Sequence, residues 1–261
     1  MGELISSPQN PHVKDLVRLR KDGEARREQG AFWLEGERAT REAVAKGLAL
    51  ELVWSPNLAP DAQDLAERAE RAGARVTRVG KDAFRKLADV RAPQGVGAVC
   101  RVPEADIDAA LGAPGALALV AAGVQDPGNL GALVRTAAAA GAGCVVATPP
   151  TCDFYNAKAV RASAGSLLAL PCARLDESEL LALLEERGVR LVASVPRGGG
   201  DYRQADWSRP VALAVGSEAH GVPETLLAAS AARVTIPIAE GVESLNAAAA
   251  AAILLFAARG T

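Results

Sequence analysis

The chain has 261 residues, of which 49% are hydrophobic and only 3% aromatic, and its formal net charge is −2. This length allows one large domain or two modest domains, each with a core built mostly from Ala, Val and Leu. The slightly negative charge argues against an overall basic nucleic-acid-binding protein, although local basic patches remain possible.

The four cysteines show no C-x-x-C pairing, and with only two histidines the sequence predicts no metal site. Free thiols in Ala- and Val-rich surroundings are typical of small buried hydrophobic residues in a reduced compartment. The N-terminus has no apolar signal core, and the longest apolar run, 247–258, is too short to span a bilayer. We therefore expect a soluble, cytoplasmic protein with no membrane partner.

Residues 1–102 alternate between short apolar runs and helical patterns, which predicts a small α/β domain. A first helix begins at Asn10-Pro11, and further helices are expected at 37–46, 61–72 and 81–87, with strands at 31–34, 50–54, 75–79 and 96–102. Residues 103–115 are rich in Pro, Ala, Asp and Gly, and this composition predicts a linker.

The first helix carries Lys14, Arg18 and Arg20 beside Asp15 and Asp22. A solvated face of mixed charge explains this pattern. A contact surface for nucleic acid explains it equally well, because basic residues outnumber acidic ones locally.

Residues 116–261 form the second expected unit, with strands at 116–122, 144–148, 190–195, 211–215 and 234–238 and helices at 132–140, 177–187 and 247–258. Two of these strands, 211–215 and 234–238, end in polar loops that carry Glu, Ser or Asn. Such loops at strand ends favour a small-molecule crevice at the edge of an α/β sheet.

The turn at residues 126–131 (DPGNLG) joins a strand to a helix, where free backbone N–H groups suit an anion. Arg135 lies on the helix face of Gly128 and Gly131 and could point over the turn. On spacing alone, a tight turn capped by Asp126 or Asn129 is the simpler interpretation. Neither a dinucleotide fingerprint nor a Walker loop is present.

The two C-terminal loops leave similar alternatives open. Glu218 could bind a ligand or pair with Arg135, or it could simply be solvated. Ser244 or Asn246 could cap the last helix, which explains the Ser-Leu-Asn triplet about as well as ligand binding does. His220 fits a surface or capping role better than a catalytic one.

Taken together, these loops resemble a known family. Residues 125–140 (QDPGNLGALVRTAAAA), 215–222 (VGSEAHGV) and 236–247 (IPIAEGVESLNA) resemble, in order and spacing, the three motifs of the SpoU/TrmH family of SPOUT-class RNA ribose 2′-O-methyltransferases. Residues 159–166 (AVRASAGS) resemble the segment between the first two motifs. The N-terminal unit, with ISSPQNPHVKDLVRLR, resembles the ribosomal-protein-like substrate-binding domain of many members.

The resemblance implies a fold: an α/β domain with a parallel sheet flanked by helices and a C-terminal deep trefoil knot, which the usual unknotted rule would not suggest. The small N-terminal α/β domain (1–102) would bind RNA, followed by a linker (103–115) and the knotted methyltransferase domain (116–261). The resemblance also implies a homodimer and S-adenosylmethionine as cofactor, held around Val195, Gly216, Ile236 and Leu245.

The implied reaction is methylation of a ribose 2′-OH, with ribosomal RNA, and 23S rRNA in particular, favoured over transfer RNA. A tRNA ribose 2′-O-methyltransferase and a non-catalytic RNA-binding protein are the alternatives. The residues matching catalytic positions are Asn129, Arg135, Glu218, Ser244 and Asn246, and those expected to contact RNA are Lys14, Arg18, Arg20, Arg161 and Ser163. A guanidinium stays protonated in proteins, so we expect Arg135 to clamp a phosphate and not to act as the base. The proton would then leave to water, to the phosphate or to Glu218.

Overall fold

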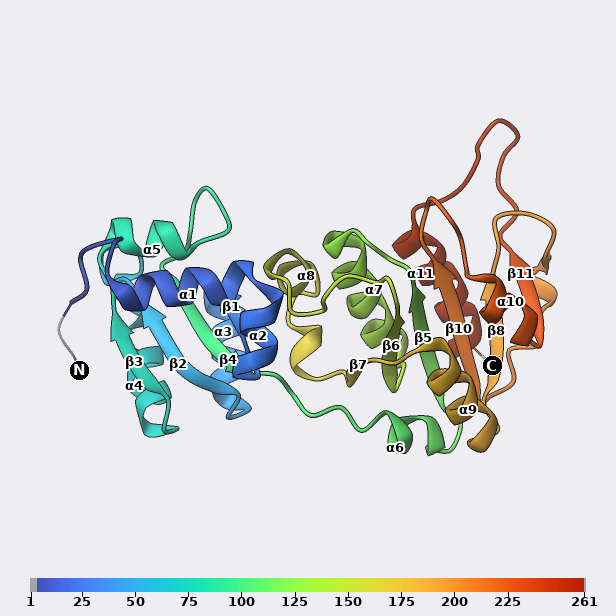
Figure 1. Cartoon of the computed structure of the whole chain (residues 1–261), viewed down its shortest axis with the longest axis horizontal. Helices are drawn as coiled ribbons and strands as arrows, with labels where there is room; N and C mark the ends of the chain where they lie inside the picture. The colour runs from blue at the N-terminus through green and yellow to red at the C-terminus, as the bar shows by residue number, and fades with distance from the viewer. Residues whose placement is uncertain (1–3, 261) are drawn as a thin grey trace. The chain divides into compact units, whose positions relative to one another are not determined.

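The computed structural model describes residues 4–260 and divides them into two compact units. Unit 1 runs to Pro103 and also contains Tyr155–Leu168, whereas unit 2 consists of Glu104–Phe154 and the residues from Ala169 onward. Each unit has its own sheet and helices (Figure 1).

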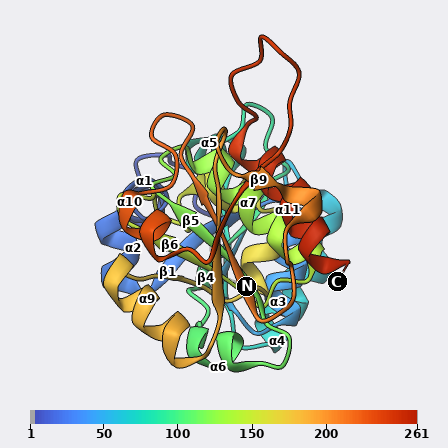
Figure 2. The same cartoon turned by 90° about the vertical axis from the view of Figure 1, so that its right-hand side faces the viewer.

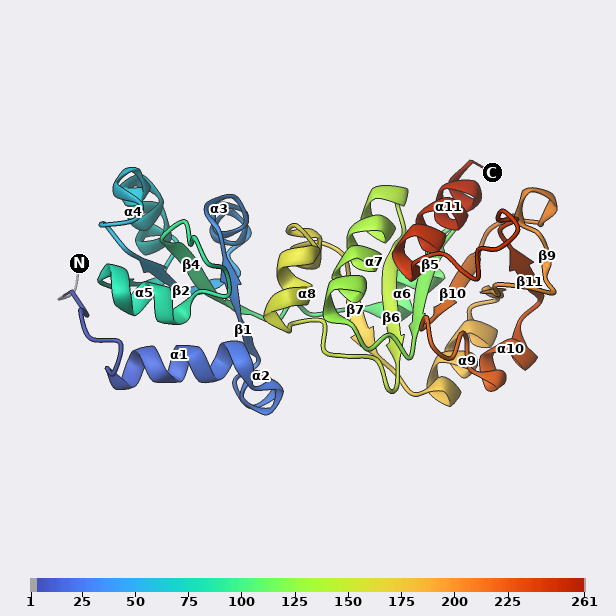
Figure 3. The same cartoon turned by 90° about the horizontal axis from the view of Figure 1, so that it is seen from above.

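Within the described residues, unit 1 has a four-stranded mixed sheet in the order β1-β4-β2-β3. Its strands are β1 (Ala31–Glu35), β2 (Ala49–Trp54), β3 (Arg75–Arg78) and β4 (Val96–Arg101), and its helices are α1 (Pro11–Lys21), α2 (Gly23–Gln29), α3 (Glu37–Ala45), α4 (Gln63–Arg71), α5 (Lys81–Leu87) and α8 (Ala157–Ala162). One core cluster lies under α1 and α5 and another under α3 and α4, so helices cover both faces of the sheet (Figure 3).

Helix α1 illustrates how local sequence sets an element. Asn10 caps it by accepting a hydrogen bond from the His12 backbone N–H at 2.9 Å, and Pro11 occupies the first turn. Val13, Leu16 and Leu19 recur at helical spacing and are all buried.

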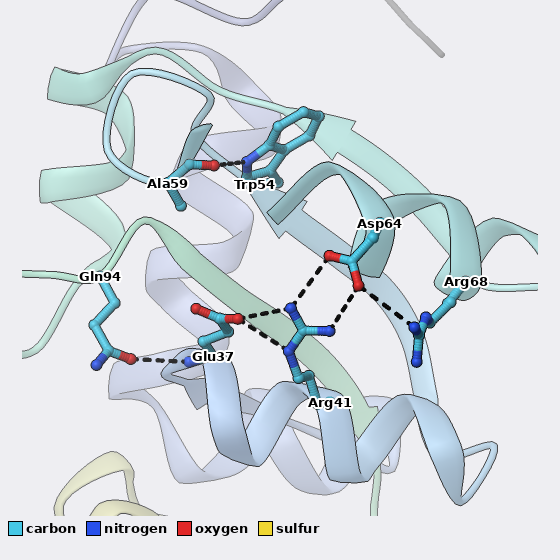
Figure 4. Close-up of polar contacts among 7 residues, drawn as sticks. All are labelled: Glu37, Arg41, Trp54, Ala59, Asp64, Arg68 and Gln94. Carbon is cyan, nitrogen blue, oxygen red and sulfur yellow. Dashed lines mark hydrogen bonds and ion pairs between the residues drawn. The ribbon is translucent and has the colours of Figure 1, made fainter. Parts of the chain in front are cut away.

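A charged network joins α3 to α4 (Figure 4). Arg41 on α3 donates two hydrogen bonds to Glu37, at 2.9 and 2.7 Å, and two to Asp64 near the start of α4, at 3.0 and 3.2 Å. Arg68 extends the network, with its Nη2 atom 3.6 Å from Oδ2 of Asp64. The two helices are thus tied together by a planar guanidinium held between two carboxylates.

The segment Tyr155–Leu168 packs in unit 1 although its neighbours in sequence belong to unit 2. The rings of Tyr155 and Phe32 lie 4.8 Å apart, and Arg161 forms an ion pair with Asp89. The ammonium of Lys46 donates to the Leu168 carbonyl at 3.3 Å.

Unit 2, as far as it is described, contains a seven-stranded sheet in the order β7-β6-β5-β10-β8-β11-β9, with every pairing parallel. The strands are β5 (Leu117–Ala122), β6 (Cys144–Thr148), β7 (Cys172–Arg174), β8 (Arg190–Ser194), β9 (Gly200–Asp201), β10 (Val211–Gly216) and β11 (Ala232–Thr235). Strand β5 is buried along its whole length, as expected of a parallel sheet covered on both faces.

The helices of unit 2 are α6 (Ile107–Gly112), α7 (Pro127–Ala140), α9 (Glu177–Glu186), α10 (Glu224–Ala229) and α11 (Ala247–Arg259). Helices α6, α9 and α10 share one core cluster with the sheet. Helices α7 and α11 pack on each other and lie on the opposite face from α9 and α10 (Figure 2). Among residues 4–260, no helix combines the length and apolar character that crossing a membrane requires.

The predicted parallel sheet flanked by helices is confirmed, and the C-terminal knot stays a prediction. Residues 103–115, expected to be a linker, contain α6, which buries Ile107 and Leu111 in the core of unit 2. Helix α7 begins earlier than expected, at Pro127, since Asp126 caps it by accepting from the Asn129 N–H. Helix α6 was not predicted because its stretch has the composition of a linker, and the start of α7 was not predicted because its first residues are typical of a turn.

Strand β11 ends at Thr235, before the expected Ile238. Pro237 has no N–H to donate to a neighbouring strand, which favours an early exit from the sheet. The sequence patterns did not predict α2, α8, α10, β7 or β9, which are all short elements of two to seven residues.

Candidate active site

A cavity of about 520 Å³ opens in unit 2 at the carboxyl ends of three neighbouring strands. Gly216 is the last residue of β10, Val195 follows β8, Ile236 follows β11, and Leu245 precedes α11. All four residues, which the sequence predicted to surround a cofactor, line this cavity. The carboxyl ends of parallel strands are where open α/β sheets bind ligands, and the volume suits a small-molecule site.

The wall formed by residues 216–221 depends on glycine. A Cβ atom on Gly216 would lie 1.9 Å from the carbonyl carbon of Gly221, a distance that no backbone tolerates. The Gly221 N–H donates to the Ser217 carbonyl at 2.9 Å, and Gly221 itself has a φ of +67°. Close backbone packing therefore requires glycine at 216, and the left-handed conformation favours it at 221.

Three polar side chains meet beside the cavity: one from the first turn of α7, one from the loop after β10 and one from the N-cap of α11. Asn129 donates through Nδ2 to Oε1 of Glu218 at 2.5 Å, and Asn246 donates through Nδ2 to Oδ1 of Asn129 at 3.0 Å. Nδ2 of Asn246 also lies 3.5 Å from Oε1 of Glu218. Glu218 lines the cavity, so the two amides fix the position of a carboxylate at its wall.

Asn246 has a second task. Its Oδ1 accepts from the N–H groups of Ala248 and Ala249 at 3.0 and 3.4 Å and caps helix α11. Capping, one of the two alternatives that the sequence left open, is therefore observed, and the amide nitrogen of the same residue bonds to Asn129 and Glu218. Ser244 also lines the cavity and is exposed.

The side chain of Arg135 is exposed on α7 and makes no hydrogen bond or ion pair with any residue between 4 and 260. The alternative in which Glu218 pairs with Arg135 is therefore wrong, because Glu218 is bonded to the two asparagines. Arg135 is also not part of the cavity wall. Its guanidinium is free to meet an anion from outside unit 2.

The residues expected to contact RNA lie in unit 1 and differ in accessibility. Lys14 is exposed, while Arg18 lies 3.7 Å from Asp22 and 3.4 Å from Glu28, which fits a mixed-charge face. Arg20 and Arg161 converge on Asp89 from α1 and α8. Ser163 is fully buried and donates its hydroxyl to the Val160 carbonyl at 2.7 Å, so an RNA contact through this hydroxyl would require the segment to rearrange.

Two further cations line the cavity and were not singled out from the sequence. Arg197 follows β8 three residues after its end, and Arg233 lies on β11, donating to the Leu227 carbonyl at 3.1 Å. Arg197 could have been found from the sequence, because it lies just beyond Val195 at the same strand end. Arg233 could not, because its place depends on the order of the strands.

Comparison with known proteins identifies the family. Residues 116–256 match the SpoU rRNA Methylase family, and residues 10–98 match the MRM3-like substrate binding domain. The 23S rRNA (guanosine(2553)-2′-O)-methyltransferase RlmP of Bacillus subtilis is 34% identical over 257 residues, which cover 98% of this chain and 99% of that protein.

Solved structures agree. The AdoMet-bound rRNA methyltransferase from Sinorhizobium meliloti has a TM-score of 0.90 and 32% identity, covering 99% of this chain and 97% of that one. The SpoU methyltransferase AviRb from Streptomyces viridochromogenes, in complex with AdoMet, has a TM-score of 0.86 and 27% identity, covering 96% and 98%. Two of its motif segments line one cavity, Asn129 of the other is bonded to Glu218 at its wall, and these matches run along its length; the chain belongs to the SpoU rRNA methylase family and carries an MRM3-like substrate-binding domain.

Proposed function

We propose that this protein transfers a methyl group from S-adenosylmethionine to the 2′-OH of a ribose in 23S rRNA. The observation that carries the proposal is the meeting of Asn129, Glu218 and Asn246 at the wall of a 520 Å³ cavity. The relative from Bacillus subtilis, similar along its whole length, is named for this reaction on a guanosine of 23S rRNA.

The cavity fits the cofactor in size and chemistry. Val195, Ile236 and Leu245 offer apolar contacts suited to a flat adenine, and the missing side chain of Gly216 lets a ligand approach the backbone. Glu218 and Arg197 offer opposite charges for the amino and carboxylate groups of an amino acid. When bound, S-adenosylmethionine supplies an electrophilic methyl group on a sulfonium.

The side chains of this protein then have to align the ribose and help its hydroxyl lose a proton. Asn129 and Asn246 hold the Glu218 carboxylate in place through their amides. We assign Arg135 to a phosphate beside the target ribose, because a guanidinium binds phosphate oxygens in pairs and stays charged. A bound cation lowers the pKa of a nearby hydroxyl, whose proton leaves to water, to the phosphate or to Glu218.

A homodimer and a knotted C-terminus are part of the proposal. Helix α11 leaves Ile253 and Phe256 exposed at 37% and 47%, four and seven residues after the exposed Ala249, so they form one apolar stripe. Arg135 is exposed on α7, the helix that packs against α11. If a second copy of the chain covers this stripe, Arg135 of each subunit lies near the other subunit. We place the protein in the cytoplasm, where ribosomal RNA is made and modified in bacteria.

The path of the chain supports the knot. Strand β11 lies next to β8, and from its end residues 236–246 lead back to α11, which packs on α7 and β10 (Figure 1). A return of this kind brings the C-terminal segment close to the loop after β10, as threading requires.

The first test is calorimetric binding of S-adenosylmethionine to the wild type and to Leu245→Trp, which would fill the apolar part of the cavity. Val242→Trp is the matched control, because Val242 lies in the same loop, is 47% exposed and does not line the cavity. We expect the control to bind like the wild type and Leu245→Trp to lose binding. Absence of binding by the wild type would contradict the proposal.

The second test maps 2′-O-methyl groups on 23S rRNA treated with the wild type, Arg135→Lys or Arg135→Ala. If Arg135 clamps a phosphate, the methylation rate should fall by about 10- to 150-fold in both variants, since this is the contribution of a hydrogen bond to a charged group. Lysine should recover little of the rate, because it cannot bind two phosphate oxygens as a planar guanidinium does. Recovery of Arg135→Lys at high pH would instead indicate that residue 135 is the base.

A further inference from the structure

Unit 1 contains a second cavity, of about 250 Å³, which the proposed reaction does not use. It lies among α1, α2, β2 and β4. Its polar lining consists of His12, Asp15, Arg18, Gln29 and Glu51, and its apolar lining of Leu16, Leu19 and Val99. The volume falls below the roughly 300–1,000 Å³ of sites for drug-sized ligands, so the cavity suits one planar ring system.

Glu51 is the unusual member of this lining. It belongs to a strand but is only 8% exposed, and a buried carboxylate is costly without partners. The register of β2 against β4 shifts between Ala49 and Glu51, leaving Leu50 unpaired and exposed at 40%. Such a β-bulge redirects a side chain, and bulges are frequent beside functional sites.

His12 is the hydrogen-bond partner of one oxygen of this carboxylate. Its Nε2 lies 2.6 Å from Oε1 of Glu51, and the Asn10 cap of α1 fixes the His12 backbone. Oε2 of Glu51 has no hydrogen-bond partner among the described residues, yet it is not one of the fully enclosed unpaired atoms. It therefore offers an acceptor to a ligand in the cavity. The exposed Asp15 offers a second carboxylate, with no partner for its oxygens within residues 4–260.

We infer that this cavity binds a guanine base of single-stranded RNA. Among the four RNA bases, only guanine presents two adjacent N–H donors, N1–H and N2–H₂, to a pair of carboxylate acceptors. Adenine and cytosine place an acceptor nitrogen beside their amino group, and the single N–H of uracil lies between two carbonyls, so carboxylates repel them. The Gln29 amide or the Arg18 guanidinium supplies a donor for the guanine O6.

The surroundings favour RNA as the source of the base. Sequence-specific proteins recognise unstacked bases of single-stranded RNA by their hydrogen-bonding edges. Lys14 and Lys21 are exposed on the same helix as His12 and offer positive charge to the phosphates. The identification of RNA as the partner rests on the proposed function, whereas the recognition of guanine rests on the cavity itself.

The test measures binding of a fluorescein-labelled pentaribonucleotide, UUGUU, to the full chain by anisotropy, beside the same oligonucleotide with inosine or adenosine at the centre. Inosine lacks only the N2 amino group, and leaving a buried carboxylate oxygen unpaired predicts binding weaker by at least about tenfold. Equal affinity for the guanosine and inosine oligonucleotides would overturn the inference.

Glu51→Gln keeps the size of the side chain but replaces one acceptor with a donor, so we expect it to abolish the preference for guanosine. Glu70→Gln is the matched control, because Glu70 is exposed on α4 and its side chain has no partner among the described residues. Asp15→Asn changes an exposed residue and tests the second acceptor even if Glu51→Gln does not fold. Unchanged preference in both Glu51→Gln and Asp15→Asn would overturn the inference.

Two further measurements separate this inference from the proposed function. If guanosine is preferred but neither S-adenosylmethionine binding nor rRNA methylation occurs, the proposed function fails and the cavity assignment stands. If methylation occurs without any preference for guanosine, the reverse holds. Guanosine 5′-monophosphate binding as tightly as UUGUU would identify a free nucleotide as the ligand and overturn the assignment to RNA.

Discussion

At the scale of single residues, the site is decided by which side chain holds Glu218. Asn129 and Asn246 donate to it, whereas Arg135, the arginine of the first motif, does not. A carboxylate held by neutral amides keeps its negative charge available to a ligand or to a proton. The same arrangement leaves the charge of Arg135 for a phosphate.

Substitution of Asn246 can separate its two tasks. Asn246→Ala removes the α11 cap and should destabilise the protein by about 1 kcal/mol, within the 0.5–2 kcal/mol range of cap losses. Asn246→Asp keeps a capping oxygen but loses the donor to Glu218 and adds a like charge beside it. We expect both variants to lose methylation, with only Asn246→Ala losing stability in urea. Full activity of Asn246→Asp would show that the amide contact is dispensable.

The cysteines give a second prediction at this scale. Burial raises the pKa of Cys100 and Cys144 to about 12, and burial with the nearby Asp153 raises the pKa of Cys152 to about 11. Only the thiolate reacts with a disulfide reagent. At pH 8 we expect Cys152, the only one of the four that is not fully buried, to react first. Its rate should be roughly a hundredfold below that of the unfolded chain, since its pKa rises from 9.0 to about 11. Fast reaction of Cys144 in the native protein would contradict this.

At the scale of elements, a few specific contacts fix how strands, turns and helices are joined. The turn after β10 closes on itself through Gly216 and Gly221, and the charged network of α3 and α4 ties two helices together. The turn requires glycine at its closest approach, and the network requires the planar guanidinium of arginine.

Gly216→Ala should destabilise unit 2 by at least about 1–3 kcal/mol, because the new methyl group meets backbone and no side-chain rotation relieves it. Binding of S-adenosylmethionine should be lost at the same time. Gly143→Ala serves as the control, since its Cβ would meet the Ala110 carbonyl oxygen at an ordinary 3.5 Å. Chemical denaturation and calorimetry measure the two effects, and equal behaviour of the two variants would exclude the close approach.

The network around Arg41 predicts a pH dependence. Hydrogen bonding to Arg41 lowers the pKa of Asp64 below its usual value of 3.8. An acid whose pKa is lowered by folding stabilises the native state above its unfolded pKa, and this contribution is lost as pH falls through the folded pKa. Arg41→Gln should thus be less stable than the wild type at pH 6, and the difference should shrink as the pH falls below 3.8 and through the lowered pKa of Asp64.

Arg38→Gln is the control for that experiment. Arg38 lies on the same helix, is exposed and makes no ion pair with the described part of the chain. Its substitution should leave the pH dependence of the unfolding midpoint unchanged. Since the Arg41 pair is partly exposed, the difference should also shrink at high salt.

At the scale of the whole molecule, the chain passes between the two units three times, after Pro103, after Phe154 and after Leu168. The family match at 116–256 includes Tyr155–Leu168, yet this segment packs in unit 1. A part of the methylase sequence thus completes the unit that matches a substrate-binding domain.

The proposed dimer is a prediction at the same scale. Phe256→Glu places a charge in the exposed apolar stripe of α11, so we expect a protein of 26.8 kDa in solution where the wild type has twice this mass. Val242→Glu alters a residue of equal exposure outside α11 and should remain dimeric. Light scattering during size-exclusion chromatography makes the comparison. A monomeric wild type would contradict the dimer.

Much of this architecture could be predicted from the sequence, because the signals are local. Apolar runs and helical spacing indicated the strands and helices of both units, and caps such as Asn10 and Asn246 depend only on residues two or three positions away. The resemblance of the motifs indicated the residues that line the larger cavity. Helix α6 was not predictable in this way, because its Ala-, Pro- and Gly-rich stretch has few large apolar residues.

Only the tertiary structure decided how distant residues meet. The partners of Glu218 lie 89 and 28 residues away, and the Asn246–Asn129 bond spans 117 residues, so they depend on strand order and not on spacing. The pairing of His12 with Glu51 depends on a bulge in β2, and the alternation of polar and apolar residues in the sequence does not predict this bulge. Propensity and capping act within a few residues, whereas the position of a side chain in a site is set by how the sheet orders its strands.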